Sequence, residues 1–262
     1  MSRKDHDPNP EDVPASASTT ANEDKGEPPQ FPDVASSPSK PRAKELATAH
    51  VLLRYGVAST NSLAKLYDLV MWSRGRGAPT HEDQGLLRAM LVMAGATLDV
   101  VVKRIIRDAL QLLVNRSKNA LETAAKHVYR RLLKNIQESG GQRLAQALLS
   151  RSPVAALVEL IIDDITGESL QSMEQVRQAA AYLGLEDFSV PQGVQEAFAA
   201  RNQIVHEMDI VHEQRKGRGR RRRQQRKKDE MRAFAEVLLR TAIQFCKSVD
   251  DALTDSHSHG RA

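Results

Sequence analysis

The chain has one cysteine, Cys246, among its 262 residues. A single cysteine excludes an internal disulfide framework and is typical of a reducing compartment. No uncharged apolar run approaches the roughly 20 residues that a membrane helix needs, and the polar first residues are unlike a signal peptide. We therefore expect a cytoplasmic protein with no membrane span.

Common sequence motifs for metal ions and bound nucleotides are also missing. The chain has no cysteine pairs, no His-Glu-x-x-His, no Asp-rich loop and no glycine-rich phosphate loop. We expect no metal site and no cofactor. Any chemistry would then depend on the side chains alone.

Aromatic residues are scarce, at 4% of the chain, whereas hydrophobic residues reach 40%. The abundance of Ala, Leu, Gln and Arg favours packed helices over sheets. Apolar residues recur at helical spacing from Pro41 onward, with glycines and prolines as stops, and no segment shows the alternation of a strand. The sequence predicts an all-α helical bundle with one core. We expect helices at about 42–55, 60–73, 82–115, 118–138, 142–150, 153–165 and 168–183, then a helix that starts at the capping box Ser189-Val-Pro191-Gln192, and a final one at about 229–253.

Proline and charge define the ends of this domain. Residues 1–41 contain eight of the eleven prolines, four basic and eight acidic side chains, and almost no large apolar ones. Such a segment buries too little apolar surface to offset its ordering entropy. We expect a disordered acidic tail at 1–41, a helical domain at 42–253 and a short flexible tail at 254–262.

The strongest charge feature is an arginine-rich insertion at 214–228. Its cations are Arg215, Lys216, Arg218, Arg220, Arg221, Arg222, Arg223, Arg226, Lys227 and Lys228. These ten charges exceed the net charge of the chain, +5, so the remainder is net acidic. We expect the insertion to attract RNA or DNA backbones without regard to sequence. The alternatives are a solvated loop or a localisation signal.

The motif with the clearest chemistry is Arg201-Asn202-Gln-Ile-Val-His206, inside a predicted amphipathic helix. An imidazole can accept a proton from a ribose hydroxyl, and a guanidinium can stabilise charge that builds on phosphate oxygens. The same Arg-x4-His spacing recurs from Arg76 to His81. Glycines and a proline interrupt that second segment, so we interpret it as coincidental.

Helix geometry separates the two motif side chains. Arg201 lies in the middle of the apolar face, where an unpaired charge is costly, and His206 points about 140° away. One alternative is therefore a structural arginine, paired with an acid such as Asp99, Asp163 or Asp164 or extended to solvent. If both motif side chains act on one phosphate, two copies of the helix about a two-fold axis are needed.

The Arg-Asn-x-x-x-His pattern, late in a helical domain and followed by one closing helix, resembles the HEPN superfamily. That family's motif is Arg-x4–6-His, often with Asn after the Arg. Residues 86–99, Leu-Leu-Arg-Ala-Met-Leu-Val-Met-Ala-Gly-Ala-Thr-Leu-Asp, are similar to the long helix of its RiboL-PSP-like branch. The resemblance covers roughly 42–253, and the arginine-rich insertion departs from it.

The resemblance implies a bundle that dimerises along the motif helices. In active members it implies a metal-independent endoribonuclease, often a toxin or a phage-defence effector. Arg201, Asn202 and His206 would be catalytic, with Asp99 as a supporting residue, and RNA would be the substrate. Two alternatives stay open: a non-catalytic module that binds nucleic acid or a partner, and a toxin held by an antitoxin protein.

Overall fold

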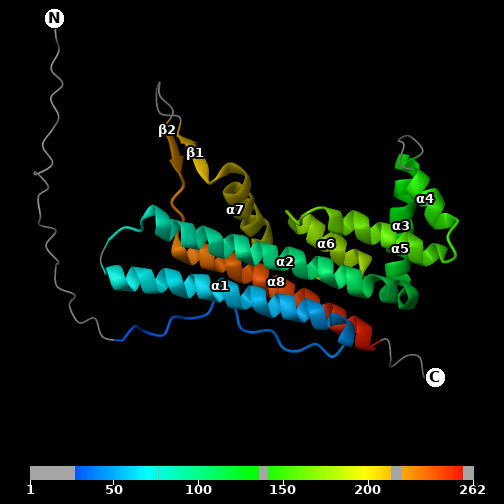
Figure 1. Cartoon of the computed structure of the whole chain (residues 1–262), viewed down its shortest axis with the longest axis horizontal. Coiled ribbons are helices and arrows are strands. Elements are labelled where there is room, and N and C mark those ends of the chain that lie inside the picture. Colours follow the sequence, from blue (N-terminus) through cyan, green and yellow to red (C-terminus); the bar gives the residue numbers. More distant parts are fainter. Residues whose placement is uncertain (1–26, 76, 136–140, 214–219, 256–262) are drawn as a thin grey trace, which may run out of the picture. The chain divides into compact units, whose positions relative to one another are not determined.

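Three long helices form the centre of the fold in the computed structural model (Figure 1). The structure describes residues 27–75, 77–135, 141–213 and 220–255. Residues from Phe31 onward belong to one compact unit, and the preceding segment is a separate one. As the sequence predicts, the described fold is helical, apart from one short two-stranded ribbon. The elements are η1 (Lys44–Leu46), α1 (Ala47–Arg74), α2 (His81–Arg116), α3 (Lys118–Asn135), α4 (Gly141–Leu148), α5 (Pro153–Gly167), α6 (Met173–Tyr182), α7 (Gly193–Glu207), β1 (Ile210–Glu213), β2 (Arg220–Arg223) and α8 (Lys228–Asp255).

Helix α2 is the central element, packed against both α1 and α8. It begins with a capping box in which Thr80 and Asp83 satisfy each other's backbone N–H groups, and Arg74 pairs with the Asp83 carboxylate. Among the described helices it is the one long and apolar enough to cross a membrane by length and composition. Over half of that apolar window, 56%, is buried in the bundle, which also fits a core helix.

Gly56 lies inside α1, although its sequence context predicted a stop between two helices at 42–55 and 60–73. A side chain at this position would overlap the hydroxyl and methyl groups of Thr97 on α2. The glycine therefore permits a close approach of two helices and does not end one. Glycine favours both roles, and the sequence alone cannot distinguish them.

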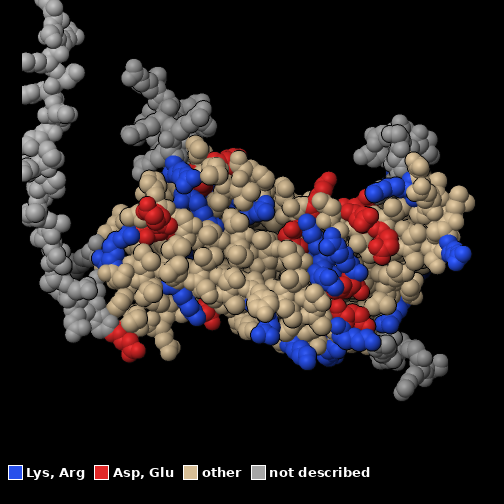
Figure 2. Space-filling model, in the orientation of Figure 1, with Lys and Arg blue, Asp and Glu red and all other residues tan. Residues whose placement is uncertain are grey.

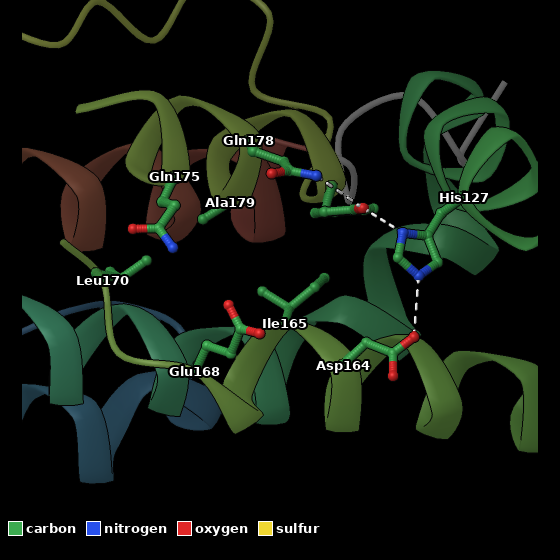
Figure 3. Close-up of a pocket in the computed structure, with 9 residues that line it drawn as sticks. His127, Asp164, Ile165, Glu168, Leu170, Gln175, Gln178 and Ala179 are labelled. Atoms are coloured by element: carbon green, nitrogen blue, oxygen red, sulfur yellow. Dashed lines mark hydrogen bonds and ion pairs between the residues drawn. The ribbon is translucent and has the colours of Figure 1, made fainter. Parts of the chain in front are cut away.

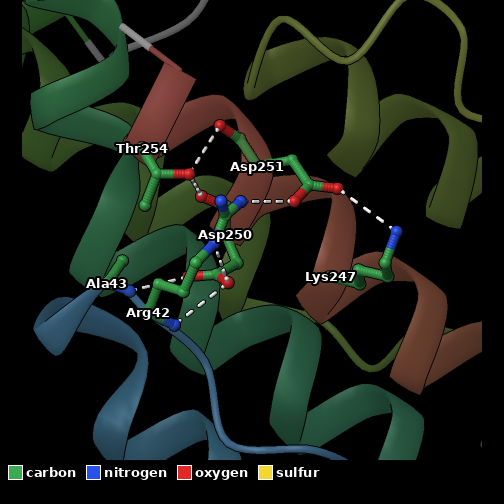
Figure 4. Close-up of polar contacts among 6 residues, drawn as sticks. All are labelled: Arg42, Ala43, Lys247, Asp250, Asp251 and Thr254. Atoms are coloured by element: carbon green, nitrogen blue, oxygen red, sulfur yellow. Dashed lines mark hydrogen bonds and ion pairs between the residues drawn. The ribbon is translucent and has the colours of Figure 1, made fainter. Parts of the chain in front are cut away.

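The ordered part of the chain begins closer to the N-terminus than the sequence predicts. Backbone N–H groups of Val34 and Ala35 donate to the Asn61 side chain, and both residues are buried. The Asp250 carboxylate on α8 accepts hydrogen bonds from the backbone of Arg42 and Ala43 (Figure 4). The expected disorder of 1–41 is thus wrong for 31–41, while residues 1–26 and 256–262 lie outside the described residues. A few backbone hydrogen bonds and two small apolar side chains hold this segment.

The strands β1 and β2 pair antiparallel, with Ile210 opposite Arg223 and Glu213 opposite Arg220. The sequence analysis predicted no strand, so this ribbon is a correction. Arginine has little preference for strands, and four arginines in a row give no alternation. Residues 214–219, which belong to the expected insertion at 214–228, lie outside the described residues.

Candidate functional site

The motif helix α7 begins later than its sequence predicts. Ser189-Val-Pro191-Gln192 reads as a capping box, but the helix starts at Gly193 without a side-chain cap. Its inner side buries Val194, Ala197, Phe198, Ala200 and Ile204 against the core. It ends at Glu207, because Met208 and Asp209 adopt left-handed backbone angles.

Arg201 is half-buried between α7 and α2. Its aliphatic stem lies against Gly95 of α2, where an added Cβ would be 3.4 Å from the arginine Cγ. The guanidinium Nη1 donates to the Asn202 side chain at 3.0 Å. Within the described residues Arg201 forms no salt bridge, and its buried Nε has no hydrogen-bond partner. The alternative of an acid-paired structural arginine therefore finds no support in the described contacts.

Asn202 connects the motif to the loop 168–172 before α6. Its amide nitrogen donates to the carbonyl of Gln171 at 3.0 Å, while its oxygen accepts from Arg201. Asp99, expected as a supporting residue, binds the same loop, because its carboxylate accepts from the backbone N–H of Leu170 at 2.8 Å. Asn202 therefore contacts Arg201 in the structure. Asp99 binds Leu170, which directly precedes Gln171, the residue that Asn202 binds.

His206 lies in the last turn of α7 and is exposed. It forms no hydrogen bond with a described residue, and it is exposed whereas the Nε of Arg201 is buried. The five-residue separation puts the two side chains on different sides of the same helix. One copy of the chain thus places the arginine against α2 and exposes the histidine to solvent.

A buried ion network lies directly after the motif helix. The Asp209 carboxylate, with no exposed surface, contacts Arg226 at 2.6 Å and Arg88 at 2.9 Å. Arg226 also donates to the side chain of Gln203, within the motif, at 2.8 Å. Left-handed conformations cost non-glycine residues about 1–2 kcal/mol, and these contacts offset that cost at Asp209. The network fixes the base of the ribbon to the motif helix.

This network corrects the expectation for Arg226, which the sequence grouped with the nucleic-acid-binding cations. Its side chain is 5% exposed and already paired, so it is not available to a phosphate on the surface. Lys228 is partly exposed and contacts Asp68 at 2.7 Å. Arg223 and Lys227 are exposed. The side chains of the other predicted cations in the insertion lie outside the described residues.

A second polar cluster lies among α3, α5 and α6 (Figure 3). The His127 ring contacts the Tyr182 hydroxyl through Nδ1 and the Asp164 carboxylate through Nε2 at 3.2 Å. Gln178 donates to the same hydroxyl, and burial raises the pKa of Tyr182. No local signal indicates the cluster, since its partners come from three separate helices.

Charged side chains are unevenly distributed over the molecule. The face in Figure 2 has a broad area without Lys, Arg, Asp or Glu over the long helices, and charges of both signs gather where α3, α5 and α6 lie.

No group of three or more His, Cys, Asp or Glu residues suited to a metal ion occurs among the described residues. No protein-family model, curated protein or solved structure matches this chain.

Proposed function

We propose that this chain is an endoribonuclease that needs no metal ion, with Arg201, Asn202 and His206 as its catalytic residues. The observation that carries the proposal is the state of Arg201: a half-buried cation with a buried Nε that lacks a partner. A buried donor without a hydrogen bond costs about 1–3 kcal/mol. A phosphate oxygen of bound RNA would compensate the charge of the guanidinium, which no described acid neutralises.

The mechanism uses the nucleophile that RNA itself contains. The 2′-hydroxyl attacks the adjacent phosphorus and loses its proton to the His206 imidazole. The bond from phosphorus to the 5′-oxygen breaks, and that oxygen takes up a proton as it leaves. Arg201 stabilises the extra negative charge on the phosphate oxygens in the transition state, and Asn202 holds the guanidinium in place. The products are a 2′,3′-cyclic phosphate and a free 5′-hydroxyl.

A homodimer would bring together the groups that one helix separates. The motif helix and its end carry two exposed apolar side chains, Val205 and Met208, which are 40% and 56% exposed. A second copy packed about a two-fold axis would cover this surface. Each composite site would then contain the Arg201 of one copy and the His206 of the other.

The basic ribbon would supply affinity without sequence preference. Arg223 and Lys227 are exposed close in sequence to the buried Asp209 network, which connects the ribbon to the end of α7. Phosphate contacts by such cations release counterions and position the backbone, but they read no base. We infer that the ribbon guides RNA toward the motif helix.

The second candidate function is a nucleic-acid-binding module without cleavage. The orientation of His206 favours this alternative, since a single copy does not bring its imidazole to Arg201. A toxin whose activity an antitoxin protein blocks is a third version of the nuclease. Its distinguishing observation is a neighbouring gene whose product binds this chain.

Substitutions test the assignment of the site. His206→Ala and Arg201→Ala should each lower RNA cleavage by about 10²-fold or more, the usual effect of removing an acid–base or oxyanion-stabilising group. Arg76→Ala and His81→Ala, which remove the coincidental Arg-x4-His pair, should leave cleavage intact. Circular dichroism on each variant separates loss of chemistry from loss of fold. Activity that survives in folded His206→Ala would overturn the assignment.

A further inference from the structure

A small cavity lies close to the motif, between α5, α6 and the loop 168–172. Its volume is about 130 Å³. Figure 3 shows Glu168 and Ile165 on one side facing Gln175 and Ala179 on the other, with Leu170 at one end. Pockets that enclose a whole small ligand measure roughly 300–1,000 Å³, so this cavity suits one group of a larger molecule.

The cavity combines apolar walls with an available acceptor. Ile165, Leu170 and Ala179 provide apolar surface, and the His127 network closes the opposite end with hydrogen bonds already formed. Glu168 is exposed, and its carboxylate has no hydrogen bond to a described residue. A flat group with N–H donors on its edge would satisfy this carboxylate.

A wider groove of about 510 Å³ continues from the cavity between α3 and α6. The two spaces share His127, Gln178 and Tyr182 in their walls. The groove adds Lys126, Arg130 and Arg177, all exposed; Arg177 pairs with Glu174 at 3.7 Å, and no ion pair joins the other two to a described acid. Cations outside and an acceptor inside match a phosphodiester chain with one base turned inward.

The cavity wall is also bonded to the motif. Leu170, at one end of the cavity, donates its N–H to Asp99, and the next residue, Gln171, accepts from Asn202. Asn202 in turn holds the Arg201 guanidinium. A base in the cavity would therefore lie one short loop away from the proposed scissile phosphate.

We propose that this cavity binds one unpaired base of the RNA that occupies the Arg201 site, and that Glu168 selects bases with an exocyclic amino group. Adenine, cytosine and guanine have such a group, and uracil does not. Unpaired bases are recognised by hydrogen bonds to their edges, and a base turned out of the stack packs between aromatic or apolar side chains. The inference rests on the proposed function only in that RNA is the ligand. It adds a base preference that the ribbon cannot supply.

The test is equilibrium binding of the full-length protein to labelled single-stranded oligonucleotides of A, C or U, each about eight nucleotides long. Wild type should bind the A or the C oligonucleotide at least tenfold more tightly than the U oligonucleotide, within the range for one well-placed base contact. Glu168→Gln should reduce this difference to less than about threefold and leave U binding unchanged. Arg177→Gln should weaken all three equally. Glu159→Gln, which changes an exposed carboxylate on α5, the helix that precedes Glu168, is the matched control.

Each outcome of this experiment supports or overturns the proposed base pocket. Equal affinity of wild type for the three oligonucleotides overturns the base pocket, and so does a preference that persists in Glu168→Gln. No binding to any oligonucleotide overturns both this inference and the proposed function. A preference that depends on Glu168, found without RNA cleavage, supports the pocket and contradicts the nuclease.

Discussion

Arg201 crosses α2 at Gly95, where a Cβ would lie 3.4 Å from the Cγ and 3.6 Å from the Nε of the arginine. Glycine at this position gives the arginine stem room to lie flat on the helix. The guanidinium is thereby held next to Asn202, with no acidic partner in the part of the chain that the structure describes. Position 95 of α2 therefore influences the geometry of the proposed site.

Substitutions at Gly95 should separate stability from activity. Gly95→Ala adds a contact of ordinary length and removes a helix-interior glycine, so the protein should gain about 0.5–1 kcal/mol in stability and keep most activity. Gly95→Leu should push the arginine away and lower cleavage at least tenfold. Urea denaturation and RNA cleavage on the same preparations measure both effects. Full activity in Gly95→Leu would mean that the position of the guanidinium is unimportant.

Mixed dimers should show that the site is composite. Arg201→Ala and His206→Ala protomers, co-expressed with different tags and purified as heterodimers, should contain one site with both residues intact and one with neither. We expect about half of wild-type activity, whereas each mutant homodimer is inactive. Ultracentrifugation must show the dimer at the assay concentration. A monomer that is fully active would contradict the shared site.

The basic residues should separate into two groups. Ser or Gln at Arg223 and Lys227, which are exposed, should weaken RNA binding and flatten its dependence on salt, with unchanged unfolding. Arg226→Gln should instead lower stability by roughly 3–5 kcal/mol, because it leaves the buried Asp209 carboxylate with fewer partners.

The matched control for the buried arginine is Asp209→Asn. It keeps the shape of the side chain, removes the anion between Arg88 and Arg226, and should also destabilise the fold. Salt titrations of binding and denaturant melts measure the two properties separately. If Arg226→Gln changes the salt slope as much as the exposed variants do and leaves unfolding unchanged, the network is not structural.

Cys246 should be unreactive until the protein opens. Burial, with Asp250 as a smaller contribution, raises the pKa of its thiol to about 11. Well below the unfolded pKa of about 9 both thiols are largely protonated, so the group has little effect on stability there. Between about pH 9 and 11 only the unfolded state loses the proton, so stability falls as pH rises. Reaction with a disulfide reagent at pH 8 should be slow in native protein and fast in urea.

The sequence could predict the helices whose limits depend on local chemistry. The expected starts of α2 at about 82 and of α5 at 153 lie within one residue of the observed starts, His81 and Pro153. Gly56 was interpreted as a stop because nothing local shows the approach of Thr97. The ribbon was not predicted for a related reason. Its base is held by the network of Asp209, Arg88 and Arg226, and these residues are far apart in the chain.

For the candidate site, too, the features that depend on local spacing could be predicted from the sequence, and those that depend on packing between helices could not. The helix position of Arg201 on an apolar face follows from spacing alone, and the structure confirms that it is half-buried. Its seat on Gly95 and the Asn202 contact to Gln171 depend on packing between helices, which one sequence does not encode in a readable pattern. The His127 cluster needs three helices in register, so no motif could have indicated it.

The most direct test of the central claim is cleavage of a labelled RNA by purified protein in EDTA, followed by analysis of the product ends. The account predicts cleavage that continues without divalent ions, with 2′,3′-cyclic phosphate and 5′-hydroxyl ends. A substrate with 2′-deoxyribose at the cleaved position should be resistant, because the attacking hydroxyl is missing. Intact RNA after incubation with wild-type dimer, or products with 5′-phosphate ends, would contradict the account.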